Sequence, residues 1–131
     1  MQVCITVPAL AAMIEAARRV HPAEACGLLL GNDGTVTIAQ PAANIAAAPL
    51  QHFDIDPAAL IAAHRAARAG GPAVLGYFHS HPTGPAAPSA TDAALAAHDG
   101  RIWAIVARDA VTLWRDGPSG FNPLSYDVVA G

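Results

Sequence analysis

Two histidines separated by one residue give the clearest chemical signal in this chain. His79 and His81 lie at the end of the apolar segment AVLGYFHSH, residues 73–81. Alternate residues of a β-strand point to the same side, so both imidazoles are expected to project together, with Ser80 on the opposite face. Imidazole nitrogens are common ligands of zinc and iron. The pair therefore predicts two ligands for one metal ion.

Asp92 is the best candidate for a third ligand. It is expected in the first turn of a helix that begins near Ser89, because Ser89-Ala90-Thr91-Asp92 resembles a capping box with Asp in place of Glu or Gln. A proline-containing loop before this helix can bring the turn back over the strand end. Two imidazoles and one carboxylate leave the fourth position of a zinc ion open for water, whose pKa falls to about 7 on zinc. We therefore expect one Zn²⁺ per chain, held by His79, His81 and Asp92.

The same residues allow other interpretations. Two histidines at an exposed strand end often bind no metal. Ser89 could act only as the N-cap of the helix, and Asp92 only as a favourable charge at the helix N-terminus. Two histidines and one carboxylate also form the facial triad of mononuclear iron enzymes. Spacing alone therefore leaves zinc, iron and no metal open.

The elements that must position these side chains follow from periodicity and from helix and turn signals. Pro8 and the pair Asp56-Pro57 are typical of helix starts, and Asn32-Asp33-Gly34 is typical of a tight turn. These signals predict strands at 3–7, 73–81 and 124–129, hairpins at 27–40 and 101–115, and helices at 8–19, 56–69 and 89–100. Because the hairpins interrupt any strict alternation of strand and helix, we expect an α/β fold with a mixed β-sheet flanked by helices.

Composition limits the class of protein further. The 131 residues fit a single domain over 1–131, and the net charge of -3 without a basic cluster argues against nucleic acid as a partner. Two cysteines, Cys4 and Cys26, are too few for a disulfide framework. The sequence shows neither a signal peptide nor an apolar run of the roughly 20 residues that span a bilayer. We expect a cytoplasmic protein without membrane contact, and the sequence leaves its oligomeric state open.

Two motifs of the chain resemble those of the JAB/MPN metalloprotease family. The first is His79-Ser80-His81-Pro82, then six residues, then Ser89 and Asp92, which resembles the JAMM motif in every spacing. The second is P-x-E-x-C-G-L-L-L-G over 22–31, which supplies Glu24. The order of the expected elements resembles the family as well, so the resemblance covers most of the chain. It implies the JAB/MPN, cytidine-deaminase-like architecture of the small single-domain prokaryotic type.

The resemblance also implies a role for each residue. His79, His81 and Asp92 would bind zinc, Glu24 would hydrogen-bond the zinc-bound water and carry its proton to the leaving amine, and the Ser89 hydroxyl would help to hold the oxyanion. The implied activity is that of a zinc-dependent isopeptidase or peptidase. Its amide bond would lie at the C-terminal Gly-Gly of a ubiquitin-like or sulfur-carrier protein.

Two alternatives remain beside the zinc hydrolase. Some members of the family have lost the metal residues and act as scaffolds, so a non-catalytic MPN-fold binding module is the first. This chain keeps all five polar residues of the motif, which argues against that alternative. A mononuclear iron enzyme is the second.

Overall fold

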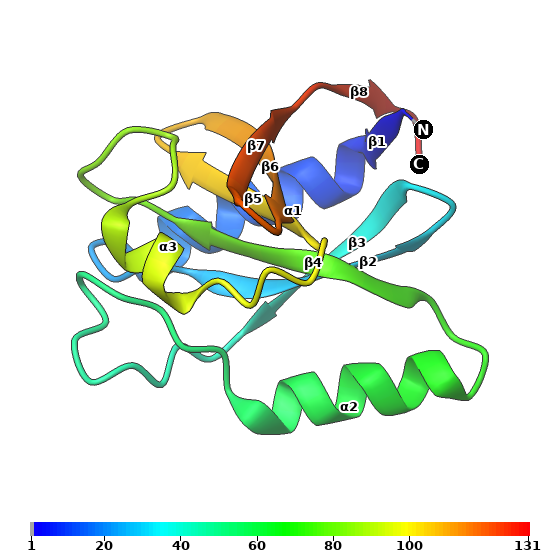
Figure 1. Cartoon of the computed structure of the whole chain (residues 1–131), viewed down its shortest axis with the longest axis horizontal. Coiled ribbons are helices and arrows are strands. Elements are labelled where there is room, and N and C mark those ends of the chain that lie inside the picture. Colours follow the sequence, from blue (N-terminus) through cyan, green and yellow to red (C-terminus); the bar gives the residue numbers. More distant parts are fainter. Residues whose placement is uncertain (1) are drawn as a thin grey trace.

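A computed structural model describes residues 2–131, and its strands form one mixed sheet flanked by helices (Figure 1). The elements are β1 (Val3–Thr6), α1 (Val7–Val20), β2 (Cys26–Asn32), β3 (Thr35–Ala42), α2 (Pro57–Arg68), β4 (Ala73–Ser80), α3 (Ala90–Leu95), β5 (Ile102–Ala107), β6 (Ala110–Gly117), β7 (Gly120–Leu124) and β8 (Tyr126–Val129). The sheet has eight strands in the order β7-β6-β5-β4-β2-β3-β1-β8. The expected mixed sheet is thus confirmed. Within residues 2–131, no helix combines the length and the apolar character that crossing a bilayer requires.

Helix α1 covers one face of the sheet. Its N-cap is Thr6, whose hydroxyl accepts a hydrogen bond from the Ala9 N–H, and Pro8 lies in the first turn, where its missing N–H is not needed. Met13 of this helix is fully buried and belongs to the same core cluster as Leu29 of β2. The expected helix at 8–19 is therefore observed with its boundaries moved by one residue at each end.

Helix α2 packs on the opposite face, as Figure 1 shows below the sheet. Asp56 caps its N-terminus by accepting a hydrogen bond from the Ala58 N–H, at 3.0 Å. Ala63 of α2 packs with Leu28 and Leu30 of β2. Since Leu29 points to α1 while Leu28 and Leu30 point to α2, the central strand β2 is buried on both faces. This burial explains the continuous apolar run CGLLLG.

The pairing of β4 with its neighbours brings the two sequence motifs together. Strand β4 runs antiparallel to β2, with Cys26 opposite His79, and parallel to β5 on its other side. Gly76 permits the close approach of β5, because a Cβ atom there would lie 1.8 Å from the Ile102 carbonyl oxygen. The C-terminal end of β4, which carries the histidines, therefore lies beside the segment that precedes β2.

Helix α3 is shorter than the sequence suggested. It ends at Leu95, not near Gly100. The N–H of His98 donates to Asp116 Oδ2 at 2.9 Å, and the N–H of Gly100 donates to the Asp116 carbonyl at 2.8 Å. His98 itself has a φ of 56°, outside the helical range. These long-range bonds to β6 hold residues 98–100 away from a helical path, so the expectation of a helix to residue 100 was wrong.

The C-terminal region also differs from the expectation. The strand expected at 124–129 is observed as β8, which pairs parallel with β1, but a further strand that was not expected, β7, precedes it and pairs antiparallel with β6 at the opposite edge of the sheet. Strand β7 contains Pro123, which an edge strand tolerates because one side of it needs no ladder hydrogen bonds. Cys4 and Cys26 are both free thiols.

Candidate metal centre

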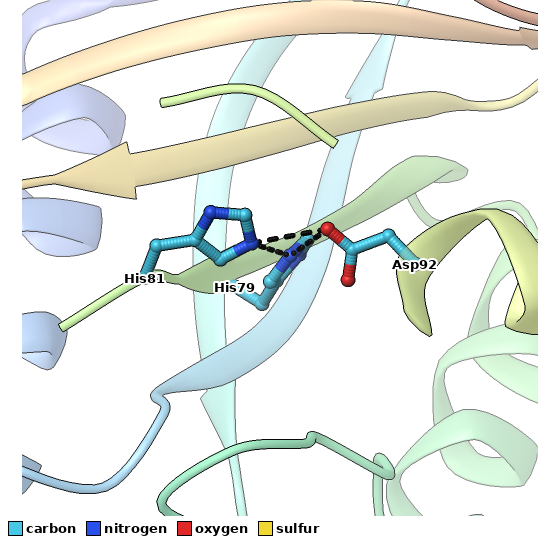
Figure 2. Close-up of side chains that lie close together, drawn as sticks. All are labelled: His79, His81 and Asp92. Carbon is cyan, nitrogen blue, oxygen red and sulfur yellow. Dashed lines mark hydrogen bonds and ion pairs between the residues drawn. The ribbon is translucent and has the colours of Figure 1, made fainter. Parts of the chain in front are cut away.

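The three residues expected to bind metal converge at the end of β4. Figure 2 shows the rings of His79 and His81 and the carboxylate of Asp92 pointing toward one another. The Nε2 atoms of the two histidines are 3.0 Å apart, and Asp92 Oδ2 lies 3.1 Å from His79 Nε2 and 3.0 Å from His81 Nε2. All three residues are buried, and their donor atoms lie close enough together to hold one metal ion. Helix α3 thus folds back over the strand end as the loop prolines suggested.

These three atoms fit a tetrahedral metal ion. Zinc bonds to nitrogen and oxygen are about 2.0–2.1 Å long, so neighbouring ligand atoms of a tetrahedral site lie about 3.3 Å apart. The observed separations of 3.0 and 3.1 Å are close to that value. The other ring nitrogen of His81, Nδ1, lies 2.8 Å from the Pro85 carbonyl oxygen, to which it can donate. That bond leaves the Nε2 lone pair of His81 free for a metal, the usual arrangement of a metal-binding histidine.

The charges of the three groups also suit a cation. Burial would raise the pKa of Asp92, but hydrogen bonds with His79 and His81 and from the Ser89 N–H hold that pKa well below its usual range. Burial lowers the pKa of His79, whose side chain has no exposed surface, and so favours the neutral imidazole that binds metals. Burial would lower the pKa of His81, but hydrogen bonds with Asp92 and with the Pro85 carbonyl raise it. The metal-free site therefore favours a proton between His81 and Asp92, in a place that a cation can occupy instead.

Glu24 precedes β2, the strand that pairs with β4, and lies beside the end of β4. Cys26 lies opposite His79 in the β2–β4 pair, and continuing this register two residues further places Glu24 opposite His81. The N–H of Glu24 donates to the Pro49 carbonyl, and its own carbonyl accepts a hydrogen bond from Asn44 Nδ2. Its backbone is therefore held on both sides without help from the carboxyl group.

Glu24 lines a cavity that His81 and Ser89 also line. This cavity, here called the metal-centre cavity, has a volume of 310 Å³ and is lined by Glu24, His81 and Ser89, among others. Burial raises the pKa of Glu24 to about 7, with the His81 charge opposing the increase and the Asp92 charge adding to it. A carboxyl group with a pKa near neutrality can both accept and release a proton at physiological pH.

This raised pKa predicts a pH-dependent stability. The folded metal-free protein binds the Glu24 proton more tightly than the unfolded chain does, so its stability falls as pH rises from the ordinary pKa of 4.5 to about 7. Glu24→Gln removes this loss. The free energy of unfolding of Glu24→Gln minus that of wild type should therefore be larger at pH 8 than at pH 5, by up to about 3 kcal/mol.

Urea unfolding in chelator at both pH values measures the effect. Glu15→Gln, at an exposed position of α1, is the matched control and should show no such increase. A difference between Glu24→Gln and wild type that stays constant from pH 5 to pH 8 would contradict the prediction.

Ser89 is the N-cap of α3. Its hydroxyl accepts a hydrogen bond from the Asp92 N–H at 3.0 Å, and its own N–H donates to Asp92 Oδ2 at 3.0 Å. The expected capping box is therefore present, with Asp92 as both capping partner and candidate ligand. Because the hydroxyl oxygen is the acceptor in this bond, its hydrogen stays available to a further partner in the metal-centre cavity.

Three residues make contacts around the site that the sequence analysis did not predict. Phe53 stacks on the ring of His79, with centroids 4.3 Å apart and an interplanar angle of 16°. Asn44 binds the carbonyls of both Glu24 and His52 and so shapes the loop around Glu24. The Ser80 hydroxyl, on the face away from the metal site as expected, accepts a hydrogen bond from the Ala25 N–H at 2.8 Å. Phe53 and Asn44 lie in no periodic or motif context, and the motif that contains Ser80 does not indicate its contact with Ala25.

Comparison with known proteins identifies the family. Residues 6–117 match the model of a family described as prokaryotic homologs of the JAB domain. The match covers most of the chain, and the chain belongs to this family. The resemblance noted in the two sequence motifs is thereby confirmed.

Two relatives agree with this assignment. The chain is 38% identical over 90 residues to a desampylase of Haloferax volcanii, covering 67% of this chain and 65% of that protein. It is 38% identical over 74 residues to a probable TtuB-protein conjugate cleaving protease of Thermus thermophilus, covering 56% of this chain and 49% of that protein. The chain thus spans just under two thirds of the first relative and about half of the second.

Solved structures confirm the architecture. A protein of Desulfitobacterium hafniense, determined in solution, has a TM-score of 0.88 at 30% identity and covers 99% of this chain and 94% of its own. A JAB1/MPN domain protein of Archaeoglobus fulgidus has a TM-score of 0.66 at 21% identity and covers 98% of this chain and 97% of its own. The second likeness shows the fold alone. The expected α/β fold of JAB/MPN type is confirmed.

Proposed function

We propose that this protein is a zinc-dependent peptidase or isopeptidase that hydrolyses an amide bond. The observation that carries the proposal is the convergence of His79 Nε2, His81 Nε2 and Asp92 Oδ2 within 3.1 Å of one another, beside a cavity that also receives Glu24. Three ligands from the protein leave a tetrahedral zinc ion with one open position, as catalytic zinc sites require. We assign one zinc ion per chain to these three residues.

The chain's own groups account for the proton transfers. When bound, zinc supplies a Lewis acid that polarises a carbonyl and makes water acidic near neutral pH. Glu24 takes the proton of the attacking water and passes it to the nitrogen of the leaving amine, because a carboxylate beside both groups can serve as base and then as acid. Glu24 lies opposite His81 but is not one of the three residues whose donor atoms converge. We therefore assign it to proton transfer and not to metal binding.

Ser89 is assigned to the developing oxyanion. Its hydroxyl hydrogen is free to donate, and a hydrogen bond that forms only in the transition state can contribute about 3 kcal/mol. We expect Ser89→Asp, which keeps a capping oxygen but cannot donate when ionised, to lower kcat by tens- to hundreds-fold. Ser89→Thr keeps the hydroxyl and should retain most activity. Steady-state rates of the two zinc-loaded variants test this, and equal rates for both would reduce Ser89 to a helix cap.

The proposed substrate is a protein conjugate joined at the C-terminal Gly-Gly of a ubiquitin-like or sulfur-carrier protein. The support is the names of the two relatives, a desampylase and a probable TtuB-protein conjugate cleaving protease, together with the match to their family. We place the reaction in the cytoplasm, in keeping with two free thiols and the reducing compartment they suit.

Metal analysis of protein purified without added metal separates the alternatives. We expect about one zinc per chain, since two imidazoles and one carboxylate are a zinc ligand set. Bound iron with oxygen-dependent turnover would replace the proposal by a mononuclear iron enzyme. Failure to take up zinc on reconstitution would favour a non-catalytic binding module on the same fold.

A further inference from the structure

The two histidines of the metal centre are held in different ways. His81 can donate from Nδ1 to the Pro85 carbonyl oxygen, 2.8 Å away. His79 Nδ1 is buried and has no hydrogen-bond partner among residues 2–131. A metal-binding histidine usually donates its second ring N–H to an oxygen atom, and this bond fixes the orientation of the ring. The orientation of the His79 ring therefore depends on packing.

Two aromatic rings pack against His79. Phe53 lies nearly parallel to the imidazole, with ring centroids 4.3 Å apart and an interplanar angle of 16°. Trp103 stands at 88° to it, with centroids 5.7 Å apart. The last torsion of a histidine side chain has broad energy wells, so the side chain does not by itself select one orientation of the ring. A ring on the face of the imidazole and another across it restrict this torsion and keep Nε2 directed at Asp92 and His81.

Phe53 belongs to no helix or strand, yet the segment around it is fixed by Asn44. The Asn44 Nδ2 group donates to the carbonyl of His52, and Oδ1 accepts from the N–H of Asp54, both at 3.0 Å. These two bonds bracket Phe53 on its N-terminal and C-terminal sides. Because Phe53 is also only 8% exposed, its ring has little freedom to leave the face of His79.

The same amide group reaches Glu24. Asn44 Nδ2 also donates to the Glu24 carbonyl at 3.0 Å, and Oδ1 accepts a second bond from the Ala46 N–H at 3.0 Å. The bond from Ala46 is that of an ordinary Asx turn, which an asparagine forms with its acceptor oxygen alone. The bonds of Nδ2, however, reach residues 8 and 20 positions away. One side chain thus joins the backbone of the proposed proton carrier to the residue that stacks on a candidate zinc ligand.

We propose that Phe53 is a positioning residue for the zinc ligand His79, and that Asn44 holds Phe53 and Glu24 in one fixed arrangement. This assignment rests on the proposed zinc site and adds residues that set its geometry. Removal of the Phe53 ring then weakens zinc binding and leaves Glu24 in place. Removal of the Asn44 donors affects both zinc binding and proton transfer. The two residues are therefore distinguished by what their loss changes.

Three variants, each measured by competition for zinc with a chelator, test the role of Phe53. Phe53→Leu keeps an apolar side chain without the stacked ring and should raise the zinc Kd about tenfold or more. Phe53→Tyr keeps the ring and should retain the wild-type Kd. Phe121→Leu removes a ring that packs on Trp103, with centroids 4.9 Å apart, and should leave the Kd unchanged. An unchanged Kd in Phe53→Leu, or an equal rise in Phe53→Tyr or Phe121→Leu, would overturn the proposal.

NMR of the metal-free protein decides the matter if wild type retains no zinc, a result that counts against the zinc site and not against the packing. The imidazole C–H signals of His79 should form one narrow set in wild type and in Phe53→Tyr. They should broaden or split in Phe53→Leu, where the ring gains a second orientation. Phe53→Met, which fills a similar volume with a flexible chain, replaces Phe53→Leu if that variant does not fold. One narrow set in every variant would overturn the proposal.

Asn44→Asp tests the link to Glu24, because aspartate keeps an acceptor oxygen but loses the Nδ2 bonds to the Glu24 and His52 carbonyls. Its added negative charge would by itself favour a bound cation, so a raised zinc Kd reports the lost donors. At saturating zinc, its single-turnover rate on the proposed Gly-Gly conjugate should fall about tenfold or more, whereas Phe53→Leu should keep the wild-type rate. Asn122→Asp, at an exposed position of β7, is the matched control and should change neither value. Equal saturated rates in Asn44→Asp and Phe53→Leu, or an unchanged zinc Kd in Asn44→Asp, would overturn the proposed link.

Discussion

Glu24→Gln is expected to lower the single-turnover rate by about 100-fold or more while leaving zinc in place. Glutamine has nearly the same shape as glutamate but cannot carry a proton. The fold should be preserved, because the hydrogen bonds that hold Glu24 in place run through its backbone, to the Pro49 carbonyl and from Asn44. The variant should still bind substrate, and so could trap a complex.

The measurement is paired on one sample: metal content by mass spectrometry and the single-turnover rate. Glu15→Gln makes the same change at an exposed position and should leave both values at wild-type level. Full zinc with a near-normal rate would remove Glu24 from the mechanism. Loss of zinc would instead make Glu24 a ligand or a group that the fold requires.

His79→Ala and His81→Ala are expected to abolish zinc retention and activity together. Each removes one of three ligands whose donor atoms lie within 3.1 Å of one another, and two ligands do not hold zinc tightly. Asp92→Asn should weaken zinc binding without removing the capping oxygen that accepts the Ser89 N–H. A neutral amide is a poorer zinc ligand than a carboxylate.

Zinc stoichiometry after dialysis checks this prediction, with circular dichroism to verify folding. His64→Ala, on α2, is the matched control and should keep one zinc per chain. His81→Ala is the more informative of the two histidine variants, because it is less prone to a folding defect. His81 retains some exposure, so its truncation leaves a smaller cavity in the core than truncation of the fully buried His79. Stoichiometric zinc in both histidine variants would contradict the ligand assignment.

The convergence of the three candidate ligands was predictable because its signals are local. The period of two along a strand places His79 and His81 on one side, and the capping pattern places Asp92 in the first turn of a helix. Glu24 is different. Residue types and spacing do not connect it with the histidines, and only the family resemblance does. The structural reason is the register of β2 against β4. A strand buried on both faces, such as CGLLLG, carries no alternation from which that register could be read.

The parts of the fold that were missed depend on contacts distant in sequence. The early end of α3 results from hydrogen bonds between residues 98–100 and Asp116, and no local breaker marks Leu95 as the last helical residue. Strand β7 contains Pro123, a residue that argues against a strand unless the strand is known to lie at an edge. Asn44 lies outside every helix and strand expected from the sequence, so its bonds around Glu24 had no sequence signal.

The most direct test of the central claim is the mass of a candidate substrate after incubation with the zinc-loaded protein. The substrate is a small Gly-Gly-ending ubiquitin-like or sulfur-carrier protein that carries a C-terminal adduct. We predict a loss of mass that leaves the Gly-Gly terminus, prevented by chelation of the metal and by Glu24→Gln. An unchanged mass in the presence of protein that holds one zinc per chain would contradict the proposed activity.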